Sequence, residues 1–386
     1  MILRAALLVS LLSLSGVPAV PRIRHVPGEY PTVQAAIDSA ADGDTVLVAP
    51  GRYVENIRLR GKNIVVGSEY LVTRDPSVIA RTILDGSHPR HPDTASVVLV
   101  VDDEDSTAVI EGFTITGGRG TVWLDIHNRN HFREGGGILC EHAAVRIRHN
   151  IIEDNEAIAV DSAVVSAGGG GIRCGDGEPL IEQNVVRRNR GLYGGGIVLK
   201  FAAATVRNNL VVGNSGGQDF GGSGIWVNNH LSRRLRNIIE NNTVVGNRAD
   251  TVGARRLRSL SGKGGGLLFL EVTATVRNNI IWGNTQQDSA QVASLAAAPS
   301  LVYNLVQGGW PGTGNLARAP LFADTVRYYL TGRSPAVDAG LGAPQFNDRA
   351  VPRRGKGPGR AASPARGTVR NDLGAYGGPG SEVLLP

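Results

Sequence analysis

The densest cluster of polar side chains in this 386-residue chain lies just before a glycine-rich stretch. It contains Asp125, His127, His131 and Glu134. Imidazole and carboxylate groups are the side chains that proteins use for proton transfer and for binding metal ions. Their spacing, however, matches no helical metal motif such as His-Glu-x-x-His. The alternative is a loop that satisfies these polar groups locally and packs Trp123 over the body of the protein, and the sequence leaves both interpretations open.

A repeated pattern follows this cluster and indicates how the chain must be organised. Five times, a glycine precedes an apolar stretch and then two asparagines that stand five residues apart. The pairs are Asn150/Asn155, Asn184/Asn189, Asn209/Asn214, Asn242/Asn247 and Asn279/Asn284. The aligned glycine stands 13 residues before the first asparagine in four units and 18 in the other, whereas successive units are 25 to 37 residues apart. Fixed strands joined by variable loops are typical of a solenoid of stacked coils.

Alternating apolar positions within each unit predict strands rather than helices. The first and third residues after the aligned glycine are apolar in every unit, as Ile138 and Cys140 are. Two further apolar columns flank the first asparagine, as Ile147 and Ile152 flank Asn150. Three short strands per unit, each about 4.8 Å from its equivalent in the next coil, predict an all-β fold, a single-stranded right-handed parallel β-helix. We expect the asparagines to mark the bends, because Asn tolerates the left-handed backbone conformation and its amide can bond to the next one in register.

The pattern resembles the bacterial extracellular right-handed parallel β-helix repeat proteins, which share the fold of pectate lyases. Three further segments carry the resemblance. They are residues 30–53, similar to the N-terminal cap and first strand of that family, residues 94–118, similar to its early coils, and residues 334–340 with 372–376, similar to its closing segment. The resemblance implies the fold, but this fold hosts lyases, hydrolases, epimerases, esterases and non-catalytic proteins.

A short helix is predicted to close the N-terminal end of the coil. Thr32 stands in an N-cap position, and Val33, Ala36, Ile37 and Ala40 fall on one helical face. Because a β-helix has an open sheet edge at each end, an uncovered end would invite edge-to-edge association. We therefore expect this helix to cover the first coil.

The resemblance also implies a groove for sugar chains beside the first strand of each coil. The outward positions of that strand include Glu141, Arg173, Lys200, Trp226 and Asn228. Loops of unequal length after the second asparagine of each unit should form a wall beside it. Trp226 could stack on a sugar ring, and the regular repeat of the coils suits an extended polysaccharide.

For a lyase, the same groove offers a base and a charge stabiliser. β-Elimination on a uronate polymer removes a proton next to a carboxylate and needs a cation to stabilise the enolate. Lys200 and Arg173 are the candidates for these roles, and Asp161 and Asp219 on the wall could bind Ca²⁺ through carboxylate oxygens. For each of these residues, the alternative is a solvated surface charge.

The two cysteines of the chain, Cys140 and Cys174, occupy the same column in consecutive coils. Their Cα atoms should lie about 5 Å apart, which a disulfide accepts, and an exported chain would be open to oxidation. The alternative is a stacked pair of free thiols in the core. The cysteines show no spacing typical of a zinc site.

The ends of the chain predict export and a basic terminal segment. Residues 1–19 combine a positive start, an apolar run and a small-residue cleavage site, as a secretory signal peptide does. Residues 20–344 then form the β-helix with its cap, and residues 345–386, rich in Pro, Gly and Arg, should wrap loosely around it. That segment carries much of the basic charge but lacks the interleaved aromatic residues of a nucleic-acid surface. We expect a monomer without a transmembrane anchor, either secreted or held in the periplasm or at the cell surface.

Three functions follow from these observations. The first is an exported protein that binds extended polysaccharide along the groove without catalysis, and a cell-surface glycan is its expected partner. The second is a polysaccharide lyase acting on uronate polymers, with Ca²⁺ as the cofactor it would use. The third is a structural or adhesive rod at the cell surface. The catalytic motifs of pectin methylesterases, polygalacturonases and pectate lyases are not found in the sequence, which favours the first.

Overall fold

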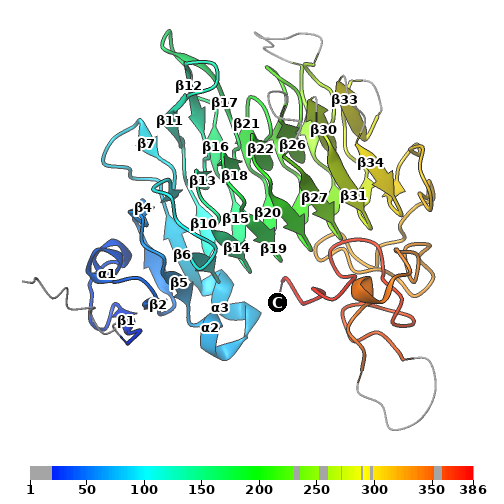
Figure 1. Ribbon diagram of the computed structural model, residues 1–386, viewed down its shortest axis with the longest axis horizontal. Coiled ribbons are helices and arrows are strands. Elements are labelled where there is room, and N and C mark those ends of the chain that lie inside the picture. Colours follow the sequence, from blue (N-terminus) through cyan, green and yellow to red (C-terminus); the bar gives the residue numbers. More distant parts are fainter. Residues whose placement is uncertain are drawn as a thin grey trace, which may run out of the picture.

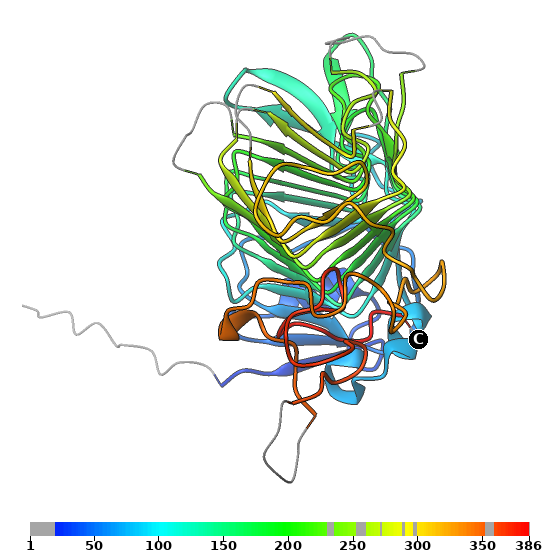
Figure 2. The same ribbon diagram turned by 90° about the vertical axis from the view of Figure 1, so that its right-hand side faces the viewer.

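The computed structural model describes residues 20–229, 235–251, 260–270, 272–287, 290–295, 299–351 and 359–385. Over these residues the chain winds into a parallel β-helix, seen from the side in Figure 1 and towards its C-terminal end in Figure 2. Each regular coil contributes one strand to each of three long sheets, here called the first-strand, second-strand and third-strand sheets. The predicted all-β parallel β-helix is therefore confirmed.

In each long sheet the strands follow one another along the coil axis in the order of the chain. The first-strand sheet consists of β4 (Ile57–Arg58), β8 (Val98–Val100), β13 (Ile138–Glu141), β18 (Ile172–Gly175), β22 (Ile197–Lys200), β26 (Ile225–Asn228), β30 (Leu267–Leu270) and β33 (Val292–Leu295). The second-strand sheet consists of β1 (Ile23–Val26), β2 (Thr45–Val48), β5 (Val65–Ser68), β9 (Val109–Glu111), β14 (Arg146–Arg148), β19 (Leu180–Glu182), β23 (Thr205–Arg207), β27 (Asn237–Glu240), β31 (Ala274–Arg277) and β34 (Ser300–Val302). The third-strand sheet consists of β3 (Gly51–Tyr53), β6 (Thr82–Asp85), β10 (Thr114–Thr116), β15 (Ile151–Glu153), β20 (Val185–Arg187), β24 (Leu210–Val212), β28 (Thr243–Val245), β32 (Ile280–Trp282) and β35 (Leu305–Val306).

Two smaller sheets and a few short helices complete the described elements. One small sheet follows the second asparagine of the repeats and consists of β16 (Glu156–Ala157), β21 (Arg190–Gly191), β25 (Ser215–Gly216) and β29 (Arg248–Ala249). The other lies outside the coil and consists of β7 (Thr94–Ala95), β11 (Gly120–Asp125), β12 (Asn130–Glu134) and β17 (Val164–Gly168). The helices are α1 (Val33–Ser39), α2 (Tyr70–Thr73), α3 (Pro76–Arg81) and the 3-10 helix η1 (Pro344–Phe346).

Aligned residues of the repeats lie side by side, because neighbouring strands pair parallel and in register. Ile138 pairs with Ile172, which in turn pairs with Ile197. These three side chains are fully buried in one continuous aliphatic core that fills the interior of the coil. Burying one such side chain stabilises the fold by about 1.5–3 kcal/mol, so a repeated apolar column supplies the main stabilisation of the stack.

Two ladders of buried asparagine amides run along the bends. The first contains Asn150, Asn184, Asn209, Asn242, Asn279 and Asn304, and the second contains Asn155, Asn189, Asn214, Asn247 and Asn284. In each ladder the Nδ2 group of one amide donates to the Oδ1 atom of the next at 2.9–3.1 Å. The predicted amide ladder is confirmed, and Asn304 extends it by one coil.

The left-handed residues of these bends are not the ladder asparagines, contrary to the prediction. The positive φ angles fall one position earlier, for example at His149 (52°), Asn208 (54°), Asn241 (51°) and Asn278 (59°). Each ladder asparagine bonds to backbone groups inside the bend. The residue before it therefore makes the turn, and its side chain is free to point outward.

The predicted N-terminal cap is confirmed. The Thr32 side chain accepts a hydrogen bond of 3.1 Å from the Ala35 N–H at the start of α1, and Val33, Ala36 and Ile37 are buried. The helix packs against β1, β2 and β4 and thus covers the first coil (Figure 1). Within the described residues, none of the helices has the length and apolar character that crossing a membrane requires. Residues 1–19, the predicted signal peptide, lie outside the described residues.

Cys140 and Cys174 pair in register in the core as free thiols, so the disulfide considered from the sequence is not formed. In-register neighbours of a parallel sheet point their Cβ atoms in the same direction, whereas a disulfide needs them to converge. The hydrogen bond with Cys174 and burial raise the pKa of the Cys140 thiol well above its usual range. The pair therefore behaves as small apolar core residues.

The described part of the C-terminal segment packs against the coils, although its composition predicted a loose wrapping. Hydrogen bonds join it to the outward left-handed residues of four successive coils, from late to early. The pairs are Asn241 with Asp372, Asn208 with Gly377, Gln183 with Gly380 and His149 with Glu382. Leu384 and Leu385 then join a buried cluster with Tyr70 of α2. Figures 1 and 2 show this return of the chain towards α2 and α3.

Four titratable groups make this C-terminal packing sensitive to pH. Burial lowers the pKa of His149, but its hydrogen bonds to Glu111 and Glu382 outweigh burial, and the net pKa is raised. The same hydrogen bond with His149 lowers the pKa of Glu382 to about 2. Burial, with the charge of Asp372, raises the pKa of Asp348 to about 8, and burial raises that of Asp372 to about 7.

We expect the thermal midpoint of the protein to fall as the pH rises from about 5 to about 8. His149, Asp348 and Asp372 each hold a proton in the folded state at a pH where the unfolded chain has lost it, so raising the pH favours unfolding. Glu382 acts in the opposite direction only below its ordinary pKa of about 4.3. Circular dichroism melting at several pH values checks this, and Asp348→Asn should flatten the profile. A midpoint that stays constant over this range would contradict it.

Candidate functional site

The polar cluster that precedes the repeats forms a β-hairpin, not an irregular loop. Strands β11 and β12 pair antiparallel, and the turn between them is closed by Asp125, which accepts the His127 N–H at 2.9 Å and the Asn128 Nδ2 group at 2.8 Å. Strand β12 pairs in turn with β17, so the hairpin is anchored at its side. Trp123 packs on Leu139 of the first-strand sheet, as the sequence suggested. The hairpin therefore lies over the outer face of that sheet.

Two buried salt-bridge systems connect this hairpin to the sheet beneath it. The Lys200 Nζ atom on β22 bonds to Asp125 of the hairpin. The Arg173 Nε atom on β18 lies 2.8 Å from an oxygen of Glu134, and its Nη1 atom bonds to Glu141. The Arg173 side chain is only 1% exposed. Asp125 and Glu134 of the polar cluster are thus joined to the strand residues by two buried salt-bridge systems, here together called the network.

The electrostatics of this network favour ionised pairs. Burial raises the pKa of Asp125, but the hydrogen bond and charge of Lys200 outweigh burial and lower the net pKa. Tyr193 donates its hydroxyl hydrogen bond to Glu134, and burial together with the Glu134 charge raises the pKa of Tyr193 well above its usual range. Charges taken out of water are retained at such a site only when they are paired. The network therefore holds the hairpin and the sheet together.

Aromatic side chains exclude water from the network. The Phe132 ring of β12 lies 4.4 Å from the Lys200 ammonium group, within the range of a cation–π contact. Tyr193 packs against Trp226 with 5.2 Å between ring centroids. The Trp226 Nε1 group donates to the Phe220 carbonyl at 3.2 Å, which satisfies its polar atom inside the protein.

The groove predicted along the first strand is covered at these positions. Glu141, Lys200 and Trp226 lie on the outer face, as predicted, but they are only 2%, 5% and 3% exposed. Asn228 continues the outer column beside Lys200 and is half-buried. The sequence could not show this cover, because the hairpin comes from a segment before the repeats. A buried indole is not available to stack on a sugar ring, nor a buried ammonium to reach a substrate.

The remaining predicted residues lie in different surroundings. Asp161 is exposed and accepts the Ala163 and Val164 N–H groups at 2.8 and 3.1 Å. Asp219 is fully buried and accepts a hydrogen bond of 2.6 Å from Ser166. These contacts hold a turn and a buried loop, and among the described residues neither carboxylate belongs to a group of potential metal ligands. His131, at the start of β12, is exposed.

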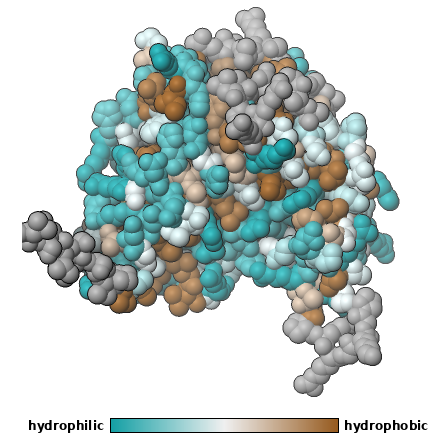
Figure 3. Space-filling view, viewed as in Figure 1, coloured by the Kyte–Doolittle hydropathy of each residue, from teal (hydrophilic) through white to brown (hydrophobic). Residues whose placement is uncertain are grey.

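The hairpin also shapes the surface of this face of the molecule. Figure 3 shows a mostly polar surface with an apolar patch at its upper left, where the hairpin projects in Figure 1. Leu124 and Ile126 at the hairpin tip are 45% and 56% exposed. Over this part of the first-strand sheet, the hairpin therefore faces the solvent and the strands beneath it do not.

An open pocket of about 640 Å³ lies on the same sheet nearer the N-terminus. It is bounded by α1, by β4 and by the loop after β6. Its basic lining consists of Arg58, Arg60, Arg90, His88 and His91. Two carboxylates also line it, but Glu55 accepts the N–H groups of Val33 and Gln34 at 2.9 and 3.0 Å, and Asp38 lies 3.4 Å from Arg60. The lining therefore holds three arginines against two carboxylates, with Arg58 paired to Asp102 and Arg60 paired to Asp38.

Sequence reasoning missed this pocket, although its basic residues are visible in the sequence. Arg58 and Arg60 alternate with buried residues on and just after β4. One short loop contains His88, Arg90 and His91. The asparagine pairs that mark the repeats begin at Asn150, so this early coil lacks the repeat signal. The hydrogen bond and charge of Asp102 raise the pKa of Arg58, so its guanidinium group stays charged.

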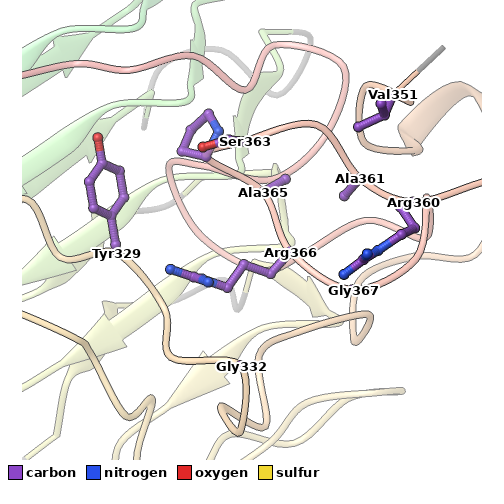
Figure 4. A pocket seen from close by; sticks show the side chains of 10 residues that line it. Tyr329, Gly332, Val351, Arg360, Ala361, Ser363, Ala365, Arg366 and Gly367 are labelled. Carbon is purple, nitrogen blue, oxygen red and sulfur yellow. The ribbon is translucent and has the colours of Figure 1, made fainter.

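Another basic pocket, of about 710 Å³, is lined by residues between 329 and 367, which follow the last strand of the coils. Figure 4 shows Tyr329 on one side of it and Arg360 on the other, with Arg366 between them. Its lining comes from the segment that follows the coils. It therefore lies away from the first-strand sheet and offers no continuous strand face to an extended ligand.

Comparison with known proteins agrees with the architecture. The family model described as right handed beta helix region matches residues 98–244 and 158–304. Similar solved structures include the pectate lyase Pel9A (TM-score 0.38, 14% identity, 93% of this chain and 96% of that chain) and a pectin methylesterase in complex with a hexasaccharide (TM-score 0.33, 7% identity, 79% and 91%). A search of curated protein sequences found no match. Because the family matches span more than half of the chain, this protein belongs to the right-handed β-helix family.

Proposed function

We propose that this protein binds an acidic polysaccharide without catalysis, at the N-terminal part of the first-strand sheet. The observation that carries the proposal is the open pocket whose lining includes Arg58, Arg60 and Arg90. Guanidinium groups bind carboxylates through paired, charge-assisted hydrogen bonds. A uronate polymer carries such a carboxylate on each acidic sugar, so it is the class of ligand that this lining suits.

The ligand is an extended chain, because the recessed surface continues beyond the pocket on the other side of Arg58 and Arg60. A shallower recess of about 540 Å³ adjoins it and is lined by Arg58, Arg60, Gly61 and Asp102. Both recesses lie beside strands of the same sheet, whose spacing of about 4.8 Å repeats along the coil axis. A polymer lying across these coils would meet the arginines at several of its sugar units.

The arrangement of the candidate catalytic residues favours binding over elimination. A general base must come within hydrogen-bond distance of the proton that it removes. Lys200 is 5% exposed and bonded to Asp125, and Arg173 is 1% exposed between two glutamates. In this arrangement neither side chain reaches a bound polymer.

Export remains part of the proposal. The signal peptide expected in residues 1–19 would bring the protein to the compartment in which acidic polysaccharides are found. We expect it to act there as a monomer. Edman sequencing of the protein secreted by an expressing bacterium would test the expected cleavage after Ala19.

The proposal predicts that purified protein binds polygalacturonate and not a neutral polysaccharide such as dextran. Affinity electrophoresis and calorimetry measure this, and the binding should weaken as salt screens the charges. Arg60→Gln and Arg90→Gln should each weaken binding by about tenfold. The matched control is Arg146→Gln, an exposed arginine on the second-strand sheet, which should leave binding unchanged.

Two outcomes would contradict the proposal. Equal binding of dextran, or equal loss of affinity in Arg146→Gln, would show that the pocket does not recognise the polymer. A rise in ultraviolet absorbance from unsaturated uronate products would show that the protein is a lyase, and would require the hairpin to open over Lys200.

A further inference from the structure

Metal-ligating side chains converge at a corner beside the turn of the hairpin. Glu141, His142 and Asp176 each offer one ligand atom, and these atoms all lie within 4.8 Å of one another. The His127 Nε2 atom of the hairpin turn lies 2.7 Å from the Asp176 Oδ1 atom. This corner was not predicted, since only Glu141 and His127 were candidates and the sequence placed them in separate groups.

The repeat itself places these residues together. Glu141 and Gly175 are register partners at the ends of β13 and β18, so His142 and Asp176 occupy the next position in consecutive coils. Both have a positive φ, 55° and 46°, which turns the chain at the same corner. Two potential ligands therefore stack on neighbouring coils, one above the other.

The hairpin supplies the remaining group from a distant part of the chain. Asp125, held by Lys200, closes the turn by accepting the His127 N–H. The His127 ring packs on the Phe201 ring with 3.9 Å between centroids, and this places its Nε2 atom against Asp176. The histidine side chain is 28% exposed and that of Asp176 is 16% exposed, so an ion can reach them from solvent.

The charge around this corner is unbalanced. The ion pairs and hydrogen bonds around it contain four carboxylates and two cationic side chains. The carboxylates are those of Asp125, Glu134, Glu141 and Asp176, and the cations are Lys200 and Arg173. With neutral histidines, two negative charges remain on this group. A divalent cation would neutralise both at once.

We propose that Glu141, His142, Asp176 and His127 bind one divalent transition-metal ion of the Zn²⁺ type, which fastens the hairpin to the coils. Two imidazole nitrogens with two carboxylate oxygens are a donor set that zinc accepts in tetrahedral geometry. Ca²⁺ prefers six to eight oxygen ligands, so the two histidines disfavour it. Because the ligands come from two coils and from the hairpin, the ion would hold the hairpin in place over the buried network. This inference is independent of the proposed glycan binding.

Calorimetric titration of chelator-treated, full-length protein with ZnCl₂ tests the site. We expect one Zn²⁺ per chain, a higher thermal midpoint with Zn²⁺ than without, and no comparable effect of CaCl₂. His142→Ala and Asp176→Asn should each weaken Zn²⁺ binding by at least about tenfold. The matched control is His131→Ala, an exposed histidine on the same hairpin, which should bind Zn²⁺ like the unaltered protein.

A second measurement reports on the hairpin itself. Arg129 is exposed in the hairpin turn, so trypsin can cut after it once the turn leaves the sheet. We expect Zn²⁺ to slow this cut in the unaltered protein and in His131→Ala, but not in His142→Ala. Circular dichroism spectra and cooperative thermal melting verify that each variant is folded. Absence of stoichiometric Zn²⁺ binding, or full Zn²⁺ binding by folded His142→Ala, would overturn the proposal.

Discussion

Lys200→Met is expected to lower the free energy of unfolding by about 3–5 kcal/mol, because it leaves the Asp125 carboxylate buried without its partner. Lys200 is 5% exposed, and its ammonium group bonds to Asp125 beneath the hairpin. Methionine keeps much of the length of the side chain, so the loss reflects the charge more than the volume. Urea denaturation followed by circular dichroism measures this effect.

The matched control for this prediction is the double variant Lys200→Met with Asp125→Asn. Replacing the carboxylate with a neutral amide removes the unpaired charge, so the double variant should recover a substantial part of the lost stability. If Lys200→Met were as stable as the unaltered protein, the ammonium group would not be paired in a buried site. That result would favour the prediction from the sequence, in which Lys200 is exposed in the groove.

Asn209→Ala is expected to destabilise the protein by about 3–5 kcal/mol. The Asn209 amide lies in the middle of the first ladder and is fully buried. Its oxygen accepts the main-chain and side-chain N–H groups of Asn184, both at 3.0 Å. Its Nδ2 group donates to the Ile181 and Arg207 carbonyls and to the Asn242 Oδ1 atom at 2.8–3.0 Å. Alanine would leave several of these groups buried and unpaired.

The control for the ladder is Asn130→Ala, at an exposed asparagine where β12 begins. Such a surface change usually alters stability by no more than about 0.5 kcal/mol. The midpoint and slope of urea unfolding, compared for the two variants, measure the difference. A loss in Asn209→Ala as small as that in Asn130→Ala would show that the ladder amides add little to the stack.

The sequence by itself determined the coil of this protein. A glycine, three short apolar strands and two asparagines recur five times, and each feature acts within one repeat. Stacking of identical units then leaves one register, since a shift by one residue would turn the apolar columns outward. The capping helix was equally predictable, because Thr32 and the apolar face of α1 are local signals.

Only the tertiary structure decided what happens on the surface of that coil. The hairpin that covers Lys200 and Arg173 has its own partners on β18 and β22, far along the chain, and its polar sequence shows no sign of them. The C-terminal segment is fixed in a similar way, by polar contacts to outward residues such as Asn208.

The physical reason is the difference between periodic and single contacts. The burial of a repeated apolar column can be predicted from the sequence, because each side chain contacts its equivalent in the neighbouring coils. A contact such as that of His127 with Asp176 occurs once, between groups that water would solvate equally well. Whether a charged or polar residue is exposed or buried therefore depends on which distant segment lies over it, and this depends on the folded chain as a whole.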